Sequence, residues 1–224
     1  APFVEGGASL ILSPDKLDIT VEITTADSTP ITVEGCIETA FQSSDVVTRL
    51  TIRGKKVIFK GNITELYFWG NQLAALNVQG LTALKKLCCD NNQLIALNVQ
   101  GCASLRELDC YSNQLTALNV QGCASLQRLK CGNNQLTALN VQGCASLQEL
   151  YCYGNKLTAL DVQGLTTLRE LWCDGNKLTE LNVQGLTALQ RLDCYNNQLT
   201  ADAFKKLFTD LPQRQDSEHA KCIL

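Results

Sequence analysis

Methionine is absent from this sequence of 224 residues, and histidine occurs once, at His219 in the carboxyl-terminal tail. This scarcity of imidazole argues against a metal centre and against histidine-based acid–base catalysis. No apolar run reaches the ~20 residues that a membrane-spanning helix needs. Basic residues (19) are fewer than acidic residues (22), which argues against a nucleic-acid or polybasic membrane surface. We therefore predict a protein that is not an enzyme, needs no cofactor and does not insert into a membrane.

The first 30 residues also lack the basic start and apolar stretch of a signal peptide. The chain begins at Ala1 without any methionine, so we expect a processed or trimmed start. A hydrophobic content of 45% with 18% charged residues is enough for a sizeable core.

A repeat of 21 residues organises most of the chain. Residues 105–125 read LRELDCYSNQLTALNVQGCAS, and their pattern returns in seven registers that start at Ile63, Leu84, Leu105, Leu126, Leu147, Leu168 and Leu189. A fixed period in the twenties with L-x-x-L-x-(L/C)-x-x-N-x-L is the signature of a leucine-rich repeat. The sequence thus predicts a right-handed, curved solenoid with a parallel β-sheet on its concave face.

Within each repeat, the spacing separates inward from outward positions. Leu108 and Cys110 alternate with polar neighbours, which is typical of a strand with one buried face. One such strand cannot bury that face alone, so the coils must stack. The next fixed position is an asparagine, which can bond backbone groups of the turn and of adjacent coils; it recurs as Asn71, Asn92, Asn113, Asn134, Asn155, Asn176 and Asn197.

We expect three segments along the chain. Residues 1–46 do not repeat, and the alternation in KLDITVEITT predicts a β-rich amino-terminal cap. Residues 47–199 form the repeats, beginning with a shortened coil of 16 residues in which Val47, Leu50, Ile52 and Val57 take repeat positions.

Residues 200–224 are predicted to close the other end of the stack. The spacing of Phe204, Leu207, Phe208 and Leu211 indicates a helix, with Thr200 as its cap and Pro212 after it. Residues 220–224 resemble the start of one more strand, so we expect the natural protein to continue beyond Leu224.

Twelve cysteines suggest disulfide bonds until their positions are compared. One buried ladder holds Cys89, Cys110, Cys131, Cys152, Cys173 and Cys194, and a second holds Cys102, Cys123 and Cys144. Other repeats carry leucine at the second position, which indicates a need for apolar volume. We favour reduced, buried thiols over disulfides between stacked strands, whose Cβ spacing is wide for a bond. The redox state of Cys36, Cys88 and Cys222 is left open.

Outward strand positions, in contrast, vary from coil to coil. All five tyrosines and both tryptophans fall in two of the three outward rows. Aromatic residues favour sheets in general, but they also supply the contact area of binding hot spots. Because an open aromatic patch usually marks a partner, we predict a ligand-binding surface comprising Tyr67, Trp69, Tyr111, Glu149, Tyr151, Tyr153, Glu170, Trp172, Asp174, Arg191, Asp193 and Tyr195.

Three functions are compatible with such a surface. The first is a module that binds a protein through the concave face, and the second is a glycan-binding module that uses the same aromatic residues. The third is a structural spacer within a larger surface protein. The sequence leaves the ligand and the oligomeric state open.

The repeats resemble those of the bacterial internalin-like leucine-rich-repeat proteins. Within that family, 21-residue repeats of the type L-x-x-L-x-C-x-x-N-x-L-x-x-L-(D/N)-V carry cysteine at the same strand position, and the similarity covers about residues 47–199. The resemblance implies a secreted or surface-attached protein of a host-associated bacterium, acting in adhesion, biofilm formation or virulence. Two features differ from the family: residues 1–46 are β-rich where internalins have a helical cap, and no wall-anchor motif is visible.

Overall fold

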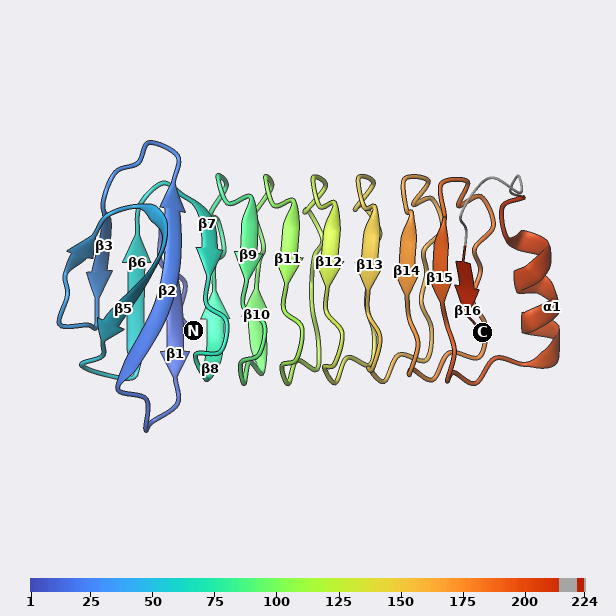
Figure 1. Cartoon of the computed structure of the whole chain (residues 1–224), viewed down its shortest axis with the longest axis horizontal. Coiled ribbons are helices and arrows are strands. Elements are labelled where there is room, and N and C mark those ends of the chain that lie inside the picture. The colour runs from blue at the N-terminus through green and yellow to red at the C-terminus, as the bar shows by residue number, and fades with distance from the viewer. Residues whose placement is uncertain (214–220, 224) are drawn as a thin grey trace.

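The computed structural model of the chain describes residues 1–213 and 221–223, which form an elongated stack of coils (Figure 1). One side of the stack is a ten-stranded sheet in the order β16-β15-β14-β13-β12-β11-β9-β7-β2-β5. Its parallel strands are β7 (Ile63–Tyr67), β9 (Lys86–Cys88), β11 (Glu107–Asp109), β12 (Arg128–Lys130), β13 (Glu149–Tyr151), β14 (Glu170–Trp172), β15 (Arg191–Asp193) and β16 (Lys221–Ile223).

Consecutive repeat strands pair without any shift of register. Leu108 of β11 lies opposite Leu87 of β9 and Leu129 of β12. Because the repeat length is constant, each inward side chain meets its own equivalent in the next coil, and these three leucines are at most 1% exposed. The predicted leucine-rich-repeat solenoid with a parallel sheet is therefore confirmed.

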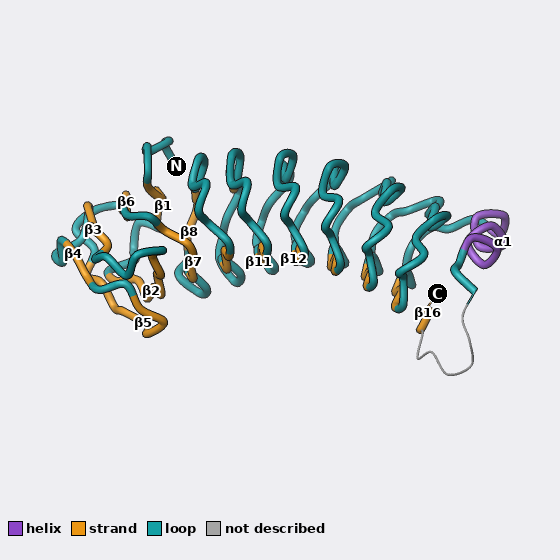
Figure 2. Tube along the Cα trace, turned by 90° about the horizontal axis from the view of Figure 1, so that it is seen from above, coloured by secondary structure: helices purple, strands orange, loops and turns teal. Residues whose placement is uncertain are grey.

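The opposite side of each coil is a return segment with little regular structure. Only β8 (Leu73–Asn77) and β10 (Ala96–Asn98) form strands there, and an isolated bridge joins Asn119 to Asn140 further along. The stack is curved, with the parallel strands along the inner edge of the arc and the returns along the outer edge (Figure 2). The outward side chains of the parallel strands consequently line a concave face.

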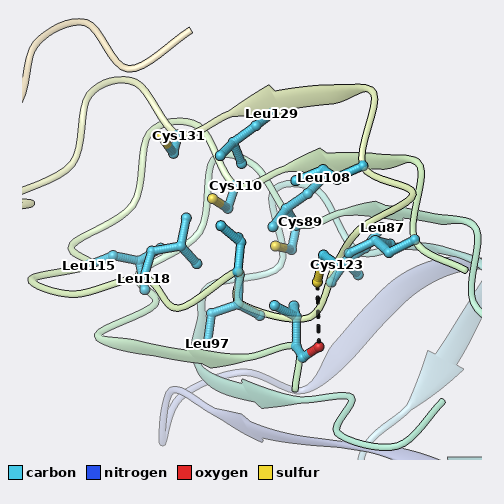
Figure 3. Packing of buried hydrophobic residues seen from close by; sticks show 14 of the residues in the cluster. Leu87, Cys89, Leu97, Leu108, Cys110, Leu115, Leu118, Cys123, Leu129 and Cys131 are labelled. Carbon is cyan, nitrogen blue, oxygen red and sulfur yellow. Dashed lines mark hydrogen bonds between the residues drawn. The ribbon is translucent and has the colours of Figure 1, made fainter. Parts of the chain in front are cut away.

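The cysteine ladder lies in the interior of the coils. Cys89, Cys110 and Cys131 follow one another in adjacent coils beside the leucines (Figure 3), and each is 0% exposed. Burial raises the pKa of these thiols well above the ordinary value. All twelve cysteines are free thiols, and in the second ladder Cys123 directs its Sγ at the carbonyl of Val99 (3.9 Å).

The asparagine row fastens each coil to its neighbours. Asn113 Nδ2 donates to the carbonyls of Cys110 in its own coil and Cys89 in the preceding coil, both at 3.0 Å. Its Oδ1 accepts a hydrogen bond from the backbone N–H of Leu94 at 2.9 Å. The predicted role of these asparagines in the turn and between coils is confirmed.

The amino-terminal part is a set of antiparallel strands that covers the first coil. It contains β1 (Gly7–Leu12), β2 (Asp18–Thr25), β3 (Ile31–Glu34), β4 (Ala40–Phe41), β5 (Ser44–Thr51) and β6 (Lys56–Lys60). Strand β2 pairs antiparallel with both β7 and β5, so it joins the parallel sheet to the cap. Strands β1 and β6 join the return strands β8 and β10 in a six-stranded sheet with the order β10-β8-β1-β6-β3-β4.

The shortened first coil expected at residues 47–62 is wrong. Strand β5 runs antiparallel to β2, and β6 runs antiparallel to β1 and β3, so neither strand belongs to the parallel stack. Val47, which the repeat spacing would place in the interior, is 49% exposed. The spacing misled because a half-buried strand has the same apolar alternation whichever way it pairs.

At the other end, α1 (Ala201–Asp210) follows the last repeat. The side chain of Thr200 accepts a hydrogen bond from the N–H of Ala203 (3.1 Å), as a cap does. Leu207 is buried, whereas Phe208 is 57% exposed and does not take part in closing the coil. Strand β16 then pairs with β15 in the parallel sense. In the described part of the chain, no helix has the length and apolar character needed to cross a membrane.

Candidate binding face

Three rows of side chains run across the concave face, one residue from each strand to a row. The register places Asp109, Lys130 and Tyr151 side by side, and the row continues through Trp172 to Asp193. The preceding row contains the charged residues Glu65, Lys86, Glu107, Arg128, Glu149, Glu170 and Arg191. The following row contains Trp69, Asp90, Tyr111, Gly132, Tyr153, Asp174 and Tyr195.

Four of the rings gather into one group, which we call the aromatic cluster: Tyr111, Tyr151, Tyr153 and Trp172. The ring of Trp172 lies edge-on to that of Tyr151, with centroids 4.9 Å apart. It also contacts Tyr153 on the other row (6.4 Å). Tyr153 in turn meets Tyr111 (5.9 Å), although their coils are separated by a third. Trp172 remains 38% exposed, so a large aromatic surface faces outward.

Gly132 makes the contact between Tyr111 and Tyr153 possible. It occupies the row position between the two tyrosines, and a Cβ atom added there would lie only 3.0 Å from the ring of Tyr153. The sequence analysis did not include Gly132 in the predicted site because glycine has no side chain that could contact a ligand. The available signal was that Gly132 is the one glycine in the three concave rows.

The aromatic cluster borders a pocket of about 490 Å³. Its other walls are Gly132 and four charged residues, Asp109, Arg128, Lys130 and Glu149. Of these four, only Glu149 was predicted as a site residue. The Nζ of Lys130 lies 3.4 Å from the carboxylate of Asp109, so the amine leans toward β11 and away from the rings on β13.

Hydrogen bonds fix the charged row beneath the aromatic cluster. Arg128 donates to both carboxylate oxygens of Glu149, from Nε at 2.6 Å and from Nη2 at 2.8 Å. These bonds lower the pKa of Glu149 despite its partial burial. The hydroxyl of Tyr151 lies 3.0 Å from Glu149 and 2.9 Å from Glu170. Burial and then these two carboxylates raise the pKa of Tyr151, so the phenol stays protonated and donates.

Three predicted aromatic residues lie outside the aromatic cluster. Tyr67 and Trp69 form a separate edge-on pair (5.9 Å) at the amino-terminal end of the face. The hydroxyl of Tyr67 donates to Glu65 (2.8 Å). Tyr195 is 49% exposed on the coil that follows Trp172. The structure thus puts all the predicted aromatic residues on one face: four in the aromatic cluster, two in a smaller pair, and Tyr195 apart from both.

The remaining predicted residues flank the aromatic cluster on its carboxyl-terminal side. The guanidinium of Arg191 lies 3.2 Å from the carboxylate of Glu170. Asp193 lies opposite Trp172 on the neighbouring strand. Burial, and then the charge of Asp193, raise the pKa of Asp174.

Cys88 is the one repeat cysteine on the outward side of a strand. Partial burial, followed by the negative charge of Asp109, raises its pKa to about 12. Because the thiolate is the reactive form, this thiol is poorly suited to act as a nucleophile.

Residues 1–213 and 221–223 contain no group of three or more His, Cys, Asp or Glu placed to hold a metal ion. His219 lies outside the described residues.

Comparisons with known proteins identify the fold. No protein-family model matches the sequence, and no curated protein does. Among solved structures, the functional domain of InlJ from Listeria monocytogenes, which includes a cysteine ladder, is 34% identical with a TM-score of 0.54. That match covers 62% of this chain and 36% of the InlJ chain.

Two further structures are similar. The leucine-rich-repeat protein LIC12759 of Leptospira interrogans is 26% identical with a TM-score of 0.56, and the match covers 72% of this chain and 48% of that one. A leucine-rich-repeat domain of a Shigella effector, 21% identical with a TM-score of 0.52 over 71% of this chain and 79% of its own, is similar in fold alone. The chain thus spans less than half of the first two proteins. It is a leucine-rich-repeat solenoid, and its cysteine ladder is a feature that it shares with the InlJ domain.

Proposed function

We propose that this chain is a non-enzymatic binding module of a secreted or surface-attached bacterial protein, and that it binds a protein partner through the concave face. The observation that carries the proposal is the aromatic cluster. Its four rings come from three coils and meet around one open pocket beside an exposed tryptophan. Tyrosine and tryptophan provide rigid, amphipathic contact area, which is why they are frequent in binding hot spots.

The polar surroundings support a binding role for the aromatic cluster. Arg128, Glu149 and Tyr151 hold one another through hydrogen bonds, so the side chains beneath the rings are ordered before a partner arrives. Such ordering reduces the entropy that is lost on binding. Adhesion to host cells or biofilm formation is the role that the resemblance of the repeats to internalin-like proteins implies, and the structural similarity to InlJ agrees with that resemblance.

A binding assay on cells tests this function. Fluorescently labelled chain is applied to cultured epithelial cells and to bacterial biofilm, and a Trp172→Ala/Tyr153→Ala double variant is compared with the wild type. We expect binding to fall at least ~10-fold, since each lost hot-spot residue costs roughly 2 kcal/mol. The matched control is Gln142→Ala/Gln163→Ala, which changes two exposed residues of the return segments. Unchanged binding by the aromatic double variant would contradict the proposal and favour a spacer.

A glycan is the second candidate ligand, and one observation favours it. The pocket combines aromatic rings with two oppositely charged pairs, Lys130 with Asp109 and Arg128 with Glu149. A sugar ring stacks on aromatic faces while its hydroxyls bond to such groups. Binding of the wild type to a glycan array, lost in the Trp172→Ala/Tyr153→Ala variant, would support this candidate over a protein partner.

A further inference from the structure

The charges of the concave face do not balance. On strands β7 to β15 its three rows hold eight carboxylates and four basic side chains, a net charge of −4, and β16 adds Lys221 beside Arg191; the whole chain carries −3. The excess negative charge of the protein is therefore concentrated on the face that carries the aromatic rings. The carboxylates are Glu65, Asp90, Glu107, Asp109, Glu149, Glu170, Asp174 and Asp193, and the bases are Lys86, Arg128, Lys130 and Arg191.

Every basic side chain of the face on strands β7 to β15 is already engaged with a carboxylate of the face. The nitrogen–oxygen distances run from 2.6 to 3.4 Å in the pairs Lys86–Glu107, Arg128–Glu149, Lys130–Asp109 and Arg191–Glu170. Three of these pairs lie in the charged row, where Glu65 forms no ion pair with a described residue, and two of them border the pocket. On strands β7 to β15 the charges that remain unpaired are all negative.

Two of these unpaired carboxylates lie beside exposed rings of the face. Asp193 is opposite Trp172 in the sheet, and Asp174 follows Trp172 by two residues on the same strand path. Within residues 1–213 and 221–223, no basic group lies within ion-pair distance of either one. Trp172 is 38% exposed and Tyr195, on the next coil, is 49% exposed.

The combination of rings and carboxylates distinguishes between ligand types. A neutral ligand could stack on Trp172, but it would leave both carboxylates without a counter-charge. A cationic side chain can lie on an aromatic face and pair with a carboxylate at the same time. Arginine does both well, since its planar guanidinium stacks on rings and forms two parallel hydrogen bonds with a carboxylate.

We propose that the carboxyl-terminal side of the aromatic cluster, formed by Trp172, Tyr195, Asp174 and Asp193, binds an arginine or lysine side chain of a basic segment in the partner protein. This proposal rests on the proposed protein-binding function and names the chemistry of the partner. The basic side chain lies against Trp172 with its charge between the two aspartates. The pocket on the other side of Trp172 then receives a neighbouring residue of the same segment.

A pair of short peptides tests this assignment. The probe is acetyl-Gly-Arg-Gly-Arg-Gly-amide, and its control contains citrulline, which has nearly the same shape without the charge, in place of each arginine. Binding is followed by the fluorescence of Trp172 in a Trp69→Phe background, in which Trp172 is the remaining tryptophan. We expect the arginine peptide to bind at least ~10-fold more tightly than the citrulline peptide, with the difference shrinking as salt increases.

Variants that neutralise carboxylates show which residues cause the preference for the arginine peptide. Asp174→Asn/Asp193→Asn should abolish the preference for arginine, whereas Asp161→Asn/Glu180→Gln, with the same change of charge on the return segments, should retain it. Loss of fold does not explain the expected result. The pKa of Asp174 is raised in the folded state, so its charged form is disfavoured there and neutralisation should leave stability at pH 7 unchanged or slightly higher.

Three results would overturn the assignment: equal binding of the two peptides, no binding of either one, or an unchanged preference in the Asp174→Asn/Asp193→Asn variant. Failure here is distinguishable from failure of the proposed function. If cell binding requires Trp172 and Tyr153 but is unaffected by Asp174→Asn/Asp193→Asn, the face binds a partner of different chemistry. Fluorescence changes with a neutral oligosaccharide such as chitotriose, insensitive to both aspartates, would identify that partner as a glycan.

Discussion

The buried rows and the concave rows of the same coils follow opposite rules. Position 110 and its equivalents are cysteine in six consecutive coils, and position 113 is asparagine in all seven. The row through Asp109, one residue away from Cys110, changes identity at almost every strand. A buried side chain packs against its own equivalent above and below, so identical residues fit best. The concave side chains are free of that requirement and can serve recognition.

The largest effect on stability is expected when one asparagine is removed from a buried row. Asn134 donates to the carbonyls of Cys110, Cys131 and Gly132, and it accepts from the N–H of Leu115. Asn134→Ala leaves these buried groups without partners, so we expect a loss of roughly 3 kcal/mol in the free energy of unfolding, measured in urea.

The matched control for that variant is Asn140→Ala. Asn140 is exposed and its Oδ1 accepts one hydrogen bond, from the N–H of Gln142 (2.9 Å). We expect this change to cost about 1 kcal/mol or less. Equal losses for the two variants would show that the buried asparagine row does not hold the coils together.

A smaller effect is expected for the cysteine ladder. In Cys131→Ser a hydroxyl replaces a fully buried thiol, which should lower the free energy of unfolding by roughly 2 kcal/mol. Cys144→Leu should cost at most about 1 kcal/mol, because the equivalent position is Leu165 in the next coil. Urea unfolding of both variants checks the order, and a harmless serine at position 131 would argue against a role as apolar filler.

Gly132→Ala tests whether a change on the concave face alters the packing of the rings while stability changes little. The added methyl group must displace the ring of Tyr153, whose nearest atoms lie 3.0 Å from the Cβ position. Gly132 itself is buried, but the ring that must move is partly exposed, so we expect a change in free energy of unfolding below about 1 kcal/mol. The contact between Tyr111 and Tyr153 should be lost, which a crystal structure of the variant would reveal. An unmoved Tyr153 ring would show that the glycine is not needed for the pocket.

The smallest effect concerns the charged row. Because Arg128 lowers the pKa of Glu149, this pair stabilises the fold above the ordinary glutamate pKa of about 4.5, and the contribution fades as pH falls through the lowered value. In Arg128→Gln, the pKa of Glu149 should rise, as measured by NMR titration of its carboxyl carbon. The difference in free energy of unfolding between variant and wild type should narrow as the pH falls below about 4.5 and through the lowered pKa of Glu149. An unchanged Glu149 pKa would contradict this account.

Most of the fold was predictable from the sequence because the repeat length alone sets the register. Once Leu108 is known to stack on Leu87 and Leu129, the positions of the aromatic rows follow. The cap was harder, since Leu50 and Ile52 have the spacing of any half-buried strand and only the pairing of β5 with β2 fixes its direction.

The pocket was harder for a different reason. A row lists which residues are neighbours, but it does not tell which way their side chains lean. Tyr153 leans across Gly132 toward Tyr111, and Lys130 leans away toward Asp109. These choices depend on contacts between coils, so the sequence predicted the aromatic face but missed four residues that line its pocket: Asp109, Arg128, Lys130 and Gly132.

The most direct test of the division between stability and recognition is the free energy of unfolding of the Trp172→Ala/Tyr153→Ala double variant, measured beside that of Asn134→Ala. The double variant removes three ring contacts on an exposed face, and we predict a loss of at most about 2 kcal/mol, smaller than that of the single asparagine change. A loss equal to or larger than that of Asn134→Ala would show that the aromatic cluster exists to stabilise the sheet, contradicting its assignment as a recognition surface.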